Sequence, residues 1–289
     1  MADAKTDSLK RKKTKRKNLR GLRLGNVTAA AAAGWIMGKK WMAMIVAVLL
    51  AMSVLSVCTA EDGLTVVELS DGMTQPEGGK VLVEGNTVTL TQPGEYLISG
   101  TLTDGMLVVD LAGEGKVTVH LNNVTIHHEN GPAIYIKNGD PRVTVSLADG
   151  SENTLSCGTD LKFETDDEPN GVIFSRSDLT INGAGSLSLT AGAMDGIASK
   201  DDLKIEGGKL NIKAARHGLR GKDAVEILGG EIEIYAAKDG IKSTNEKDEE
   251  LGYVSITGGT IHITCGDDPI QFVTNYRQEN AKVTVDMIR

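Results

Sequence analysis

Apolar and polar residues alternate in short runs through the second half of the chain. In residues 203–212 and again in 225–234, Val, Ile or Leu occupies every second position of two runs that are separated by a Gly-Gly pair. Alternation with a period of two indicates β-strands that bury one face. Each run is only four or five residues long, so the pattern predicts many short strands joined by tight turns.

The alternating runs belong to a repeated unit. The tripeptides that begin at Asp195, His217 and Asp239 are Asp-Gly-Ile, His-Gly-Leu and Asp-Gly-Ile, and they are 22 residues apart. The paired glycines at 207–208 and 229–230 repeat at the same interval, and the next pair at 258–259 follows 29 residues later. The polar segment 244–253 accounts for the longer interval, and we expect it to protrude as a loop.

Earlier segments continue the repeat in a looser form. Residues 178–191 carry the same unit offset by 24, and 116–139 and 142–156 carry related strands. A unit of about 22 residues with two or three strands matches one turn of a parallel β-helix, whereas propeller blades need about 40 residues. We therefore predict an all-β solenoid with one continuous core over 116–289, preceded by an N-terminal β segment and cap over 61–115.

Charge divides the chain into three parts. Residues 1–40 hold twelve Lys or Arg and two acids, residues 41–60 hold no charge, and residues 61–289 hold 19 basic and 37 acidic side chains. The acidic body should repel nucleic acid, whose binding depends on Lys and Arg, and should instead attract cations.

The basic start and the uncharged run from Trp41 to Cys58 predict export, because they match the basic and apolar regions of a secretory signal. Three fates stay open for this segment. Small residues allow cleavage after Ala60, the run is long enough to remain as a membrane anchor, and Cys58 is a candidate for lipidation although Val57 before it is bulky. Each alternative places the body on the cell surface or in a secreted form, with membrane contact only through the N-terminal segment.

Two cysteines, Cys157 and Cys265, remain in the body. In the predicted stack they lie several turns apart, and a disulfide requires Cα atoms within about 7 Å. We expect two buried, unpaired thiols.

Stacking would bring acidic residues of successive units together. Asp201 should lie beside Asp223, followed by Asn245 if the insertion begins after it, and Asp178 should lie beside Asp202. A second column should contain these residues in order: Asp195, His217, Asp239 and then Asp267 and Asp268.

Two interpretations of these columns stay open. Carboxylates about 5 Å apart repel by roughly 3 kcal/mol at an effective dielectric constant near 20, so they need compensation. One source is a salt-bridged surface with Lys200, Lys222, Arg216 and Arg220. The other is bound calcium, which prefers oxygen ligands of this kind. Zinc is disfavoured because the histidines lack close ligand spacing.

The same columns allow a catalytic alternative. A calcium-dependent polysaccharide lyase removes a proton beside a uronate carboxylate with Lys or Arg, and Lys200, Arg216, Arg220 and Lys242 are candidates by position only. Because no nucleophile elbow, P-loop or dinucleotide-binding motif is present, we assign no catalytic residue.

Several longer motifs resemble those of a known family. They are LTQPGEYLISGTLTDGMLVVDL (90–111), LNNVTIHHENGPAIYIKN (121–138), SLADGSENTLS (146–156) and the repeated units up to Asp268-Pro269-Ile270. Together they resemble the clostridial-type calcium-binding, carbohydrate-binding β-helix proteins. The resemblance implies a right-handed parallel β-helix, calcium sites and affinity for cellulose or pectin-like polymers. His217 stands where neighbouring units have Asp, which argues against a metal centred on that unit.

Three hypotheses for function follow. The first is an exported, non-catalytic protein that binds polysaccharide with the help of calcium. The second is a calcium-dependent pectate-type lyase, and the third is a structural adhesin of the cell surface.

Overall fold

The computed structural model describes residues 57–59, 63–138, 141–161 and 169–288. The chain divides after Val54 into two compact units, and all described residues belong to the second, Leu55–Arg289. The basic segment 1–40 and nearly all of the predicted export segment 41–60 lie outside the described residues. No helix within the described ranges is both long and apolar enough to cross a membrane.

The described residues form two β-sheets and contain no helix. The larger sheet comprises β1 (Val57–Thr59), β2 (Leu64–Leu69), β5 (Gly94–Leu102), β7 (Gly115–His128), β9 (Pro141–Leu147), β10 (Glu152–Cys157), β12 (Leu179–Gly183), β13 (Ser186–Ala191), β15 (Asp202–Ile205), β16 (Lys209–Ala214), β18 (Ala224–Ile227), β19 (Glu231–Ala236), β21 (Tyr253–Ile256), β22 (Thr260–Cys265), β24 (Tyr276–Gln278) and β25 (Lys282–Met287). The smaller sheet comprises β3 (Val81–Glu84), β4 (Thr87–Leu90), β6 (Met106–Val109), β8 (Ile134–Ile136), β11 (Gly171–Ser175), β14 (Asp195–Ser199), β17 (Leu219–Gly221), β20 (Ile241–Ser243) and β23 (Ile270–Gln271).

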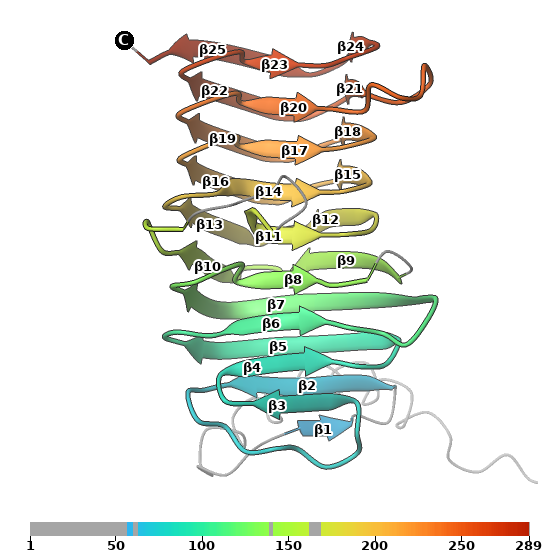
Figure 1. The fold of residues 1–289 in the computed structure, drawn as a ribbon, viewed down its shortest axis with the longest axis vertical. Coiled ribbons are helices and arrows are strands. Elements are labelled where there is room, and N and C mark those ends of the chain that lie inside the picture. The colour runs from blue at the N-terminus through green and yellow to red at the C-terminus, as the bar shows by residue number, and fades with distance from the viewer. Residues whose placement is uncertain (1–56, 60–62, 139–140, 162–168, 289) are drawn as a thin grey trace, which may run out of the picture. The chain divides into compact units, whose positions relative to one another are not determined.

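Each repeated unit contributes three strands, and each strand pairs with its equivalent in the next unit. In the smaller sheet β14 pairs with β17, which pairs with β20 and then β23. The larger sheet has two wings that meet at β7, one running through β9 to β24 and the other through β10 to β25 (Figure 1). Among the described strands, the pairs β1–β2 and β3–β4 are antiparallel and all other pairs are parallel.

The strand register explains the alternating pattern of the sequence. Leu203 pairs with Val225, and Leu210 pairs with Ile232. In β16 and β19 every second side chain is buried, and the intervening polar side chains are exposed. One hydrophobic cluster runs from Val67 to Cys265. Apolar side chains of successive units therefore stack into a continuous core, and β7 carries that core across the predicted boundary between residues 115 and 116.

Glycine is required at two kinds of position in the unit. Gly230, the second residue of a Gly-Gly pair, has φ of 102°, a conformation that side-chain-bearing residues rarely adopt. A Cβ atom on Gly218 would lie 2.4 Å from Ile234 Cγ2 and 2.6 Å from the Gly240 carbonyl oxygen. The first glycine therefore allows a corner, and the second allows neighbouring units to approach closely.

Two other predictions are confirmed. Cys157 and Cys265 are both buried and not disulfide-bonded. Most of the predicted insertion lies in a loop between β20 and β21 that projects from the stacked strands (Figure 1), with residues 246–250 exposed, whereas Tyr253 already belongs to β21.

Candidate functional site

The first predicted group of acids does come together. We define the acid cluster as Asp178, Asp201, Asp202, Asp223 and Asn245. Leu179 pairs with Leu203, so the preceding residues Asp178 and Asp202 are also neighbours. The backbone N–H of Asp223 donates to the Asp201 carbonyl oxygen (3.3 Å). The Asn245 Nδ2 donates a hydrogen bond of 2.6 Å to Asp223 Oδ1, so the condition for placing Asn245 in this column is met.

The acid cluster is short of positive charge. Burial, a hydrogen bond with Asp223 and the charge of Asp178 raise the pKa of Asp201 to about 6. Burial and the charges of Asp178 and Glu226 raise the pKa of Asp202 to about 6.

Asp223 behaves differently within the cluster. Burial acts to raise its pKa, but hydrogen bonds with Asn245 and Asp201 and the charge of Lys222 lower it overall. Lys222 Nζ lies 3.4 Å from Asp223 Oδ1. Burial, together with the charges of neighbouring carboxyl groups, therefore disfavours ionisation of Asp201 and Asp202.

The second predicted column forms a ladder of hydrogen bonds between units. We define the ladder as Asp195, His217, Asp239 and Asp268. The backbone N–H of His217 donates to Asp195 Oδ1 (3.2 Å), that of Asp239 donates to His217 Nδ1 (3.3 Å), and that of Asp268 donates to Asp239 Oδ1 (3.0 Å). Each of the first three side chains thus accepts an N–H from the unit that follows.

Cations compensate the carboxylates of the ladder. Asp195 is fully buried, and Arg220 Nε lies 2.9 Å from its Oδ2 while Arg216 Nε lies 3.5 Å from its Oδ1. The Lys242 ammonium group donates a 3.0 Å hydrogen bond to Asp239 Oδ2. The ladder therefore has the salt-bridged character that was one of the two interpretations of these columns.

The imidazole of His217 is neutral at pH 7. Burial lowers its pKa to about 4, and the nearby charges of Asp195 and Lys242 act in opposite directions. Its Nδ1 lies 3.1 Å from Asp239 Oδ2, but this contact is an ion pair only when the ring is protonated. At neutral pH the ring therefore serves chiefly as the acceptor of the Asp239 N–H.

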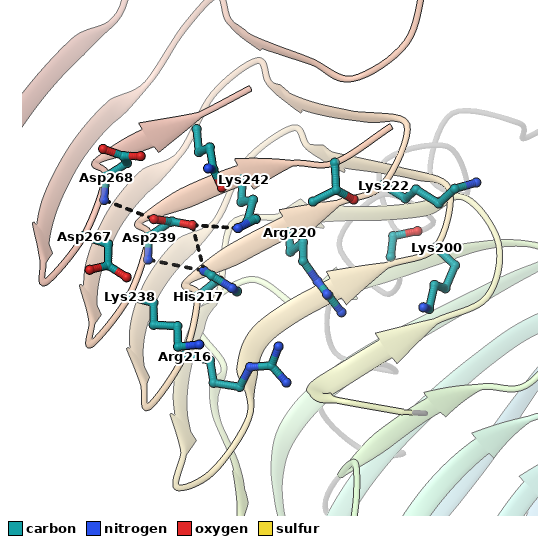
Figure 2. A pocket seen from close by; sticks show the side chains of 13 residues that line it. Lys200, Arg216, His217, Arg220, Lys222, Lys238, Asp239, Lys242, Asp267 and Asp268 are labelled. Carbon is teal, nitrogen blue, oxygen red and sulfur yellow. Dashed lines mark hydrogen bonds and ion pairs between the residues drawn. The ribbon is translucent and has the colours of Figure 1, made fainter. Parts of the chain in front are cut away.

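A groove of about 770 Å³ lies over β14, β17, β20 and β23, beside the ladder (Figure 2). Six of the described residues that line it are cations, although the body is strongly acidic overall. They are Lys200, Arg216, Arg220, Lys222, Lys238 and Lys242. Asp239, Asp267 and Asp268 also line the groove, and the last two are exposed.

The cations recur with the period of the unit. Arg220 pairs in register with Lys242, and Lys200 and Lys222 follow Ser199 and Gly221, which also pair. Sequence reasoning assigned these side chains to neutralising the acids or to catalysis, and it missed Lys238, Gln271 and the groove itself. The sequence feature that could have revealed the groove is the 22-residue spacing within three basic pairs, namely 200/222, 216/238 and 220/242.

The acid cluster adjoins the groove through Lys222, which lines the groove and contacts Asp223. The chemistry of the cluster suits a hard cation, because its donors are carboxylate and amide oxygens. In the described ranges, however, no three His, Cys, Asp or Glu side chains are grouped closely enough to hold a metal ion.

Comparison with known proteins identifies the class to which this chain belongs. A family model described as "Carbohydrate-binding domain-containing protein" matches residues 84–288. The chain belongs to this family. A relative from Acetivibrio thermocellus with the same description is 45% identical over 207 residues, which cover 71% of this chain and 72% of the relative.

A solved structure has a similar fold. It is described as the polysaccharide lyase-like protein from C. thermocellum, a gadolinium derivative. The TM-score is 0.72 and the sequences are 37% identical, and the match covers 81% of this chain and 92% of that protein.

Proposed function

We propose that this chain is an exported, non-catalytic protein that binds an acidic, pectin-like polysaccharide in the groove with the help of calcium at the acid cluster. The observation that carries the proposal is the concentration of six Lys and Arg side chains around one groove in a body with an excess of acids.

The groove favours recognition by charge. Among the described residues that line it, cations outnumber carboxylates, and none is Phe, Tyr or Trp. Neutral sugars are usually held against aromatic faces, whereas uronate carboxylates pair with guanidinium and ammonium groups through charge-assisted hydrogen bonds. Basic pairs that recur from one unit to the next give a polymer with regularly spaced carboxylates several contacts along its length.

Calcium at the acid cluster is supported by electrostatics. Because no three acids of the cluster are grouped closely enough to hold the ion in the described positions, the proposal requires their side chains to move together when calcium binds. The raised pKa values of Asp201 and Asp202 mean that their ionised forms lack compensation, and a divalent cation would supply it. Because the ladder is already compensated by Arg216, Arg220 and Lys242, we confine the calcium proposal to the acid cluster.

The handedness of the winding is part of the same proposal. We infer that the units wind as a right-handed parallel β-helix with about 22 residues per turn, since parallel strands joined by crossovers are right-handed in nearly all cases. An experimental structure that traced left-handed crossovers would contradict this description.

The proposed location is the cell surface or the medium. Support comes from the uncharged run at 41–58 and the basic residues before it. Fractionation of the producing cells, with sequencing of the mature N-terminus, distinguishes cleavage after Ala60 from a retained or lipidated anchor.

The central experiment measures binding of the full chain to polygalacturonate and to a neutral glucan, each with calcium and with chelator. We expect binding to polygalacturonate that weakens as salt rises, because the contacts are ionic. Exchange of Lys222 and Lys238 for Gln should weaken binding about tenfold, at roughly 0.5–1 kcal/mol per lost ion pair. The matched control is Lys116→Gln, an exposed residue on β7. Unchanged binding by the groove variant, or equal binding of the neutral polymer, would rule out the groove as the site.

One observation favours a second candidate function, a pectate-type lyase. All four basic residues proposed as catalytic from the sequence, Lys200, Arg216, Arg220 and Lys242, line the groove. Incubation with pectate or alginate in calcium should then release unsaturated uronides, detected by ultraviolet absorbance. Binding without such release supports the non-catalytic function.

A further inference from the structure

Strand β25 lies at an edge of the larger sheet, and its apolar side chains are only partly covered. Val285 and Met287 are 40% and 50% exposed, although their register partners on β22, Ile263 and Cys265, are fully buried. Val283 packs against the hydrophobic cluster and is only partly buried. The side chains that continue the core are therefore uncovered on the side of β25 that faces away from β22.

The backbone of β25 can accept another strand. It is an edge strand of the larger sheet, and among the described strands it pairs only with β22. The N–H groups of Lys282 and Ile288 donate to the carbonyls of Gly259 and Cys265, so even-numbered residues bond toward the preceding unit. Because hydrogen-bonding groups alternate along a strand, Val283, Val285 and Met287 direct theirs to the open edge.

We propose that the open edge of β25 binds β25 of a second copy of this chain, antiparallel and centred on Thr284. In this register Lys282 lies opposite the partner's Asp286, and Val283 lies opposite the partner's Val285. The contact has twofold symmetry, so each charge pair and each apolar pair occurs twice. The inward rows of both strands lie on the same face of the joined sheet, and the two cores become continuous.

The order of residues in β25 selects this register. Antiparallel pairing requires residues with outward hydrogen-bonding groups to face each other, which allows odd positions to oppose only odd positions. In the two neighbouring registers that satisfy this rule, Asp286 faces Asn280 or Thr284 and gains no cationic partner. Opposite charges on facing positions stabilise a strand pair, and like charges destabilise it.

The side chains of Lys282 and Asp286 are exposed and can therefore form the charge pairs of the proposed contact. The Asp286 side chain is 68% exposed, and its Oδ2 lies 2.9 Å from His262 Nε2. Lys282 is exposed on the same face of the strand. A self-complementary charge order beside an uncovered apolar row fits a second copy of β25 better than an unrelated strand, because the same sequence supplies both partners of each pair.

Sedimentation equilibrium of the full chain in detergent over a range of concentrations tests the proposal. We expect a monomer–dimer equilibrium that Lys282→Glu or Asp286→Lys weakens at least about tenfold, since each creates two like-charge contacts. The double variant Lys282→Glu/Asp286→Lys exchanges the charges and should restore the wild-type constant. Lys116→Glu, a matched charge reversal on β7, should leave association unchanged.

A second measurement fixes the register without any variant. Zero-length carbodiimide cross-linking of mixed light and heavy-isotope chains should give a mixed-isotope Lys282–Asp286 peptide. A monomer at all concentrations, or a dimer that ignores both reversals and lacks this cross-link, overturns the proposal. Cross-links from β25 to residues 1–56, or to the β1–β3 region of another copy, would instead identify a different occupant of the edge and reject self-pairing.

Discussion

The acid cluster and the ladder arise from the same spacing and the same residue type, yet their electrostatic states are opposite. In the ladder, Asp195 lies beneath two guanidinium groups and Asp239 contacts Lys242. In the cluster, Asp201 and Asp202 face other carboxylates and keep protons up to about pH 6. The comparison shows that a column of aspartates has no fixed electrostatic state, because its neighbours along the unit decide whether its carboxylates are paired with cations.

The ladder and the acid cluster should differ most in the free energy of unfolding that is lost when one Asp is removed from each. Asp195→Ala leaves Arg216 and Arg220 facing an empty buried position, and breaking a buried ion pair from one side costs about 3 kcal/mol or more. Urea unfolding of the full chain should show this loss, whereas Asp178→Ala should cost far less without calcium. If both variants behave alike, the ladder is not a buried ionic support.

Calcium should stabilise the protein through the cluster alone. At a calcium concentration of about 100 times the dissociation constant, binding adds about 2.7 kcal/mol to the free energy of unfolding. Thermal melts with calcium and with chelator should differ for the wild-type chain and coincide for Asp201→Asn/Asp223→Asn. A calcium response that survives in this variant would place the cation elsewhere.

Low pH should remove the response to calcium. Asp201 and Asp202 must lose their protons to bind the cation, so calcium affinity should fall below about pH 6, by up to about tenfold per carboxyl group at pH 5. Without calcium, the quantity that depends on pH is the free energy of unfolding, and it changes in the opposite direction. Both pKa values are raised above the ordinary value, the folded state holds the extra protons, and stability should decrease as pH rises through about 6. Titration calorimetry and chelator melts at pH 5 and 7.5 measure the two effects.

The smallest effect is a gain in stability. Asp202→Asn removes one of the like charges in the cluster and should raise the free energy of unfolding by about 0.5 kcal/mol in chelator, the usual scale for facing like charges. In saturating calcium the same variant should lose its advantage because it has lost a ligand. Destabilisation in chelator would show that Asp202 is already compensated.

The sequence predicted the neighbours within each column but not their electrostatic state. The 22-residue spacing was sufficient to pair Asp201 with Asp223 and to predict the burial of Leu210 and Ile232, because the strand register follows directly from the spacing. The spacing did not predict the ion pair of Arg220, because its long side chain reaches Asp195, 25 positions earlier in the chain. The groove was missed for the same reason. Its cations come from several units and from both ends of short strands, and their convergence depends on side-chain directions that spacing does not encode.

The constant register between units has a consequence for how proteins of this kind can change over generations. Deletion or duplication of one complete 22-residue segment would leave each remaining strand with an equivalent neighbour, while a change of one residue would turn the apolar rows outward. Duplication of one segment would also add one basic residue to a column such as Arg220 and Lys242. The length of the basic groove can therefore change in steps of one unit while the packing of the interior stays the same.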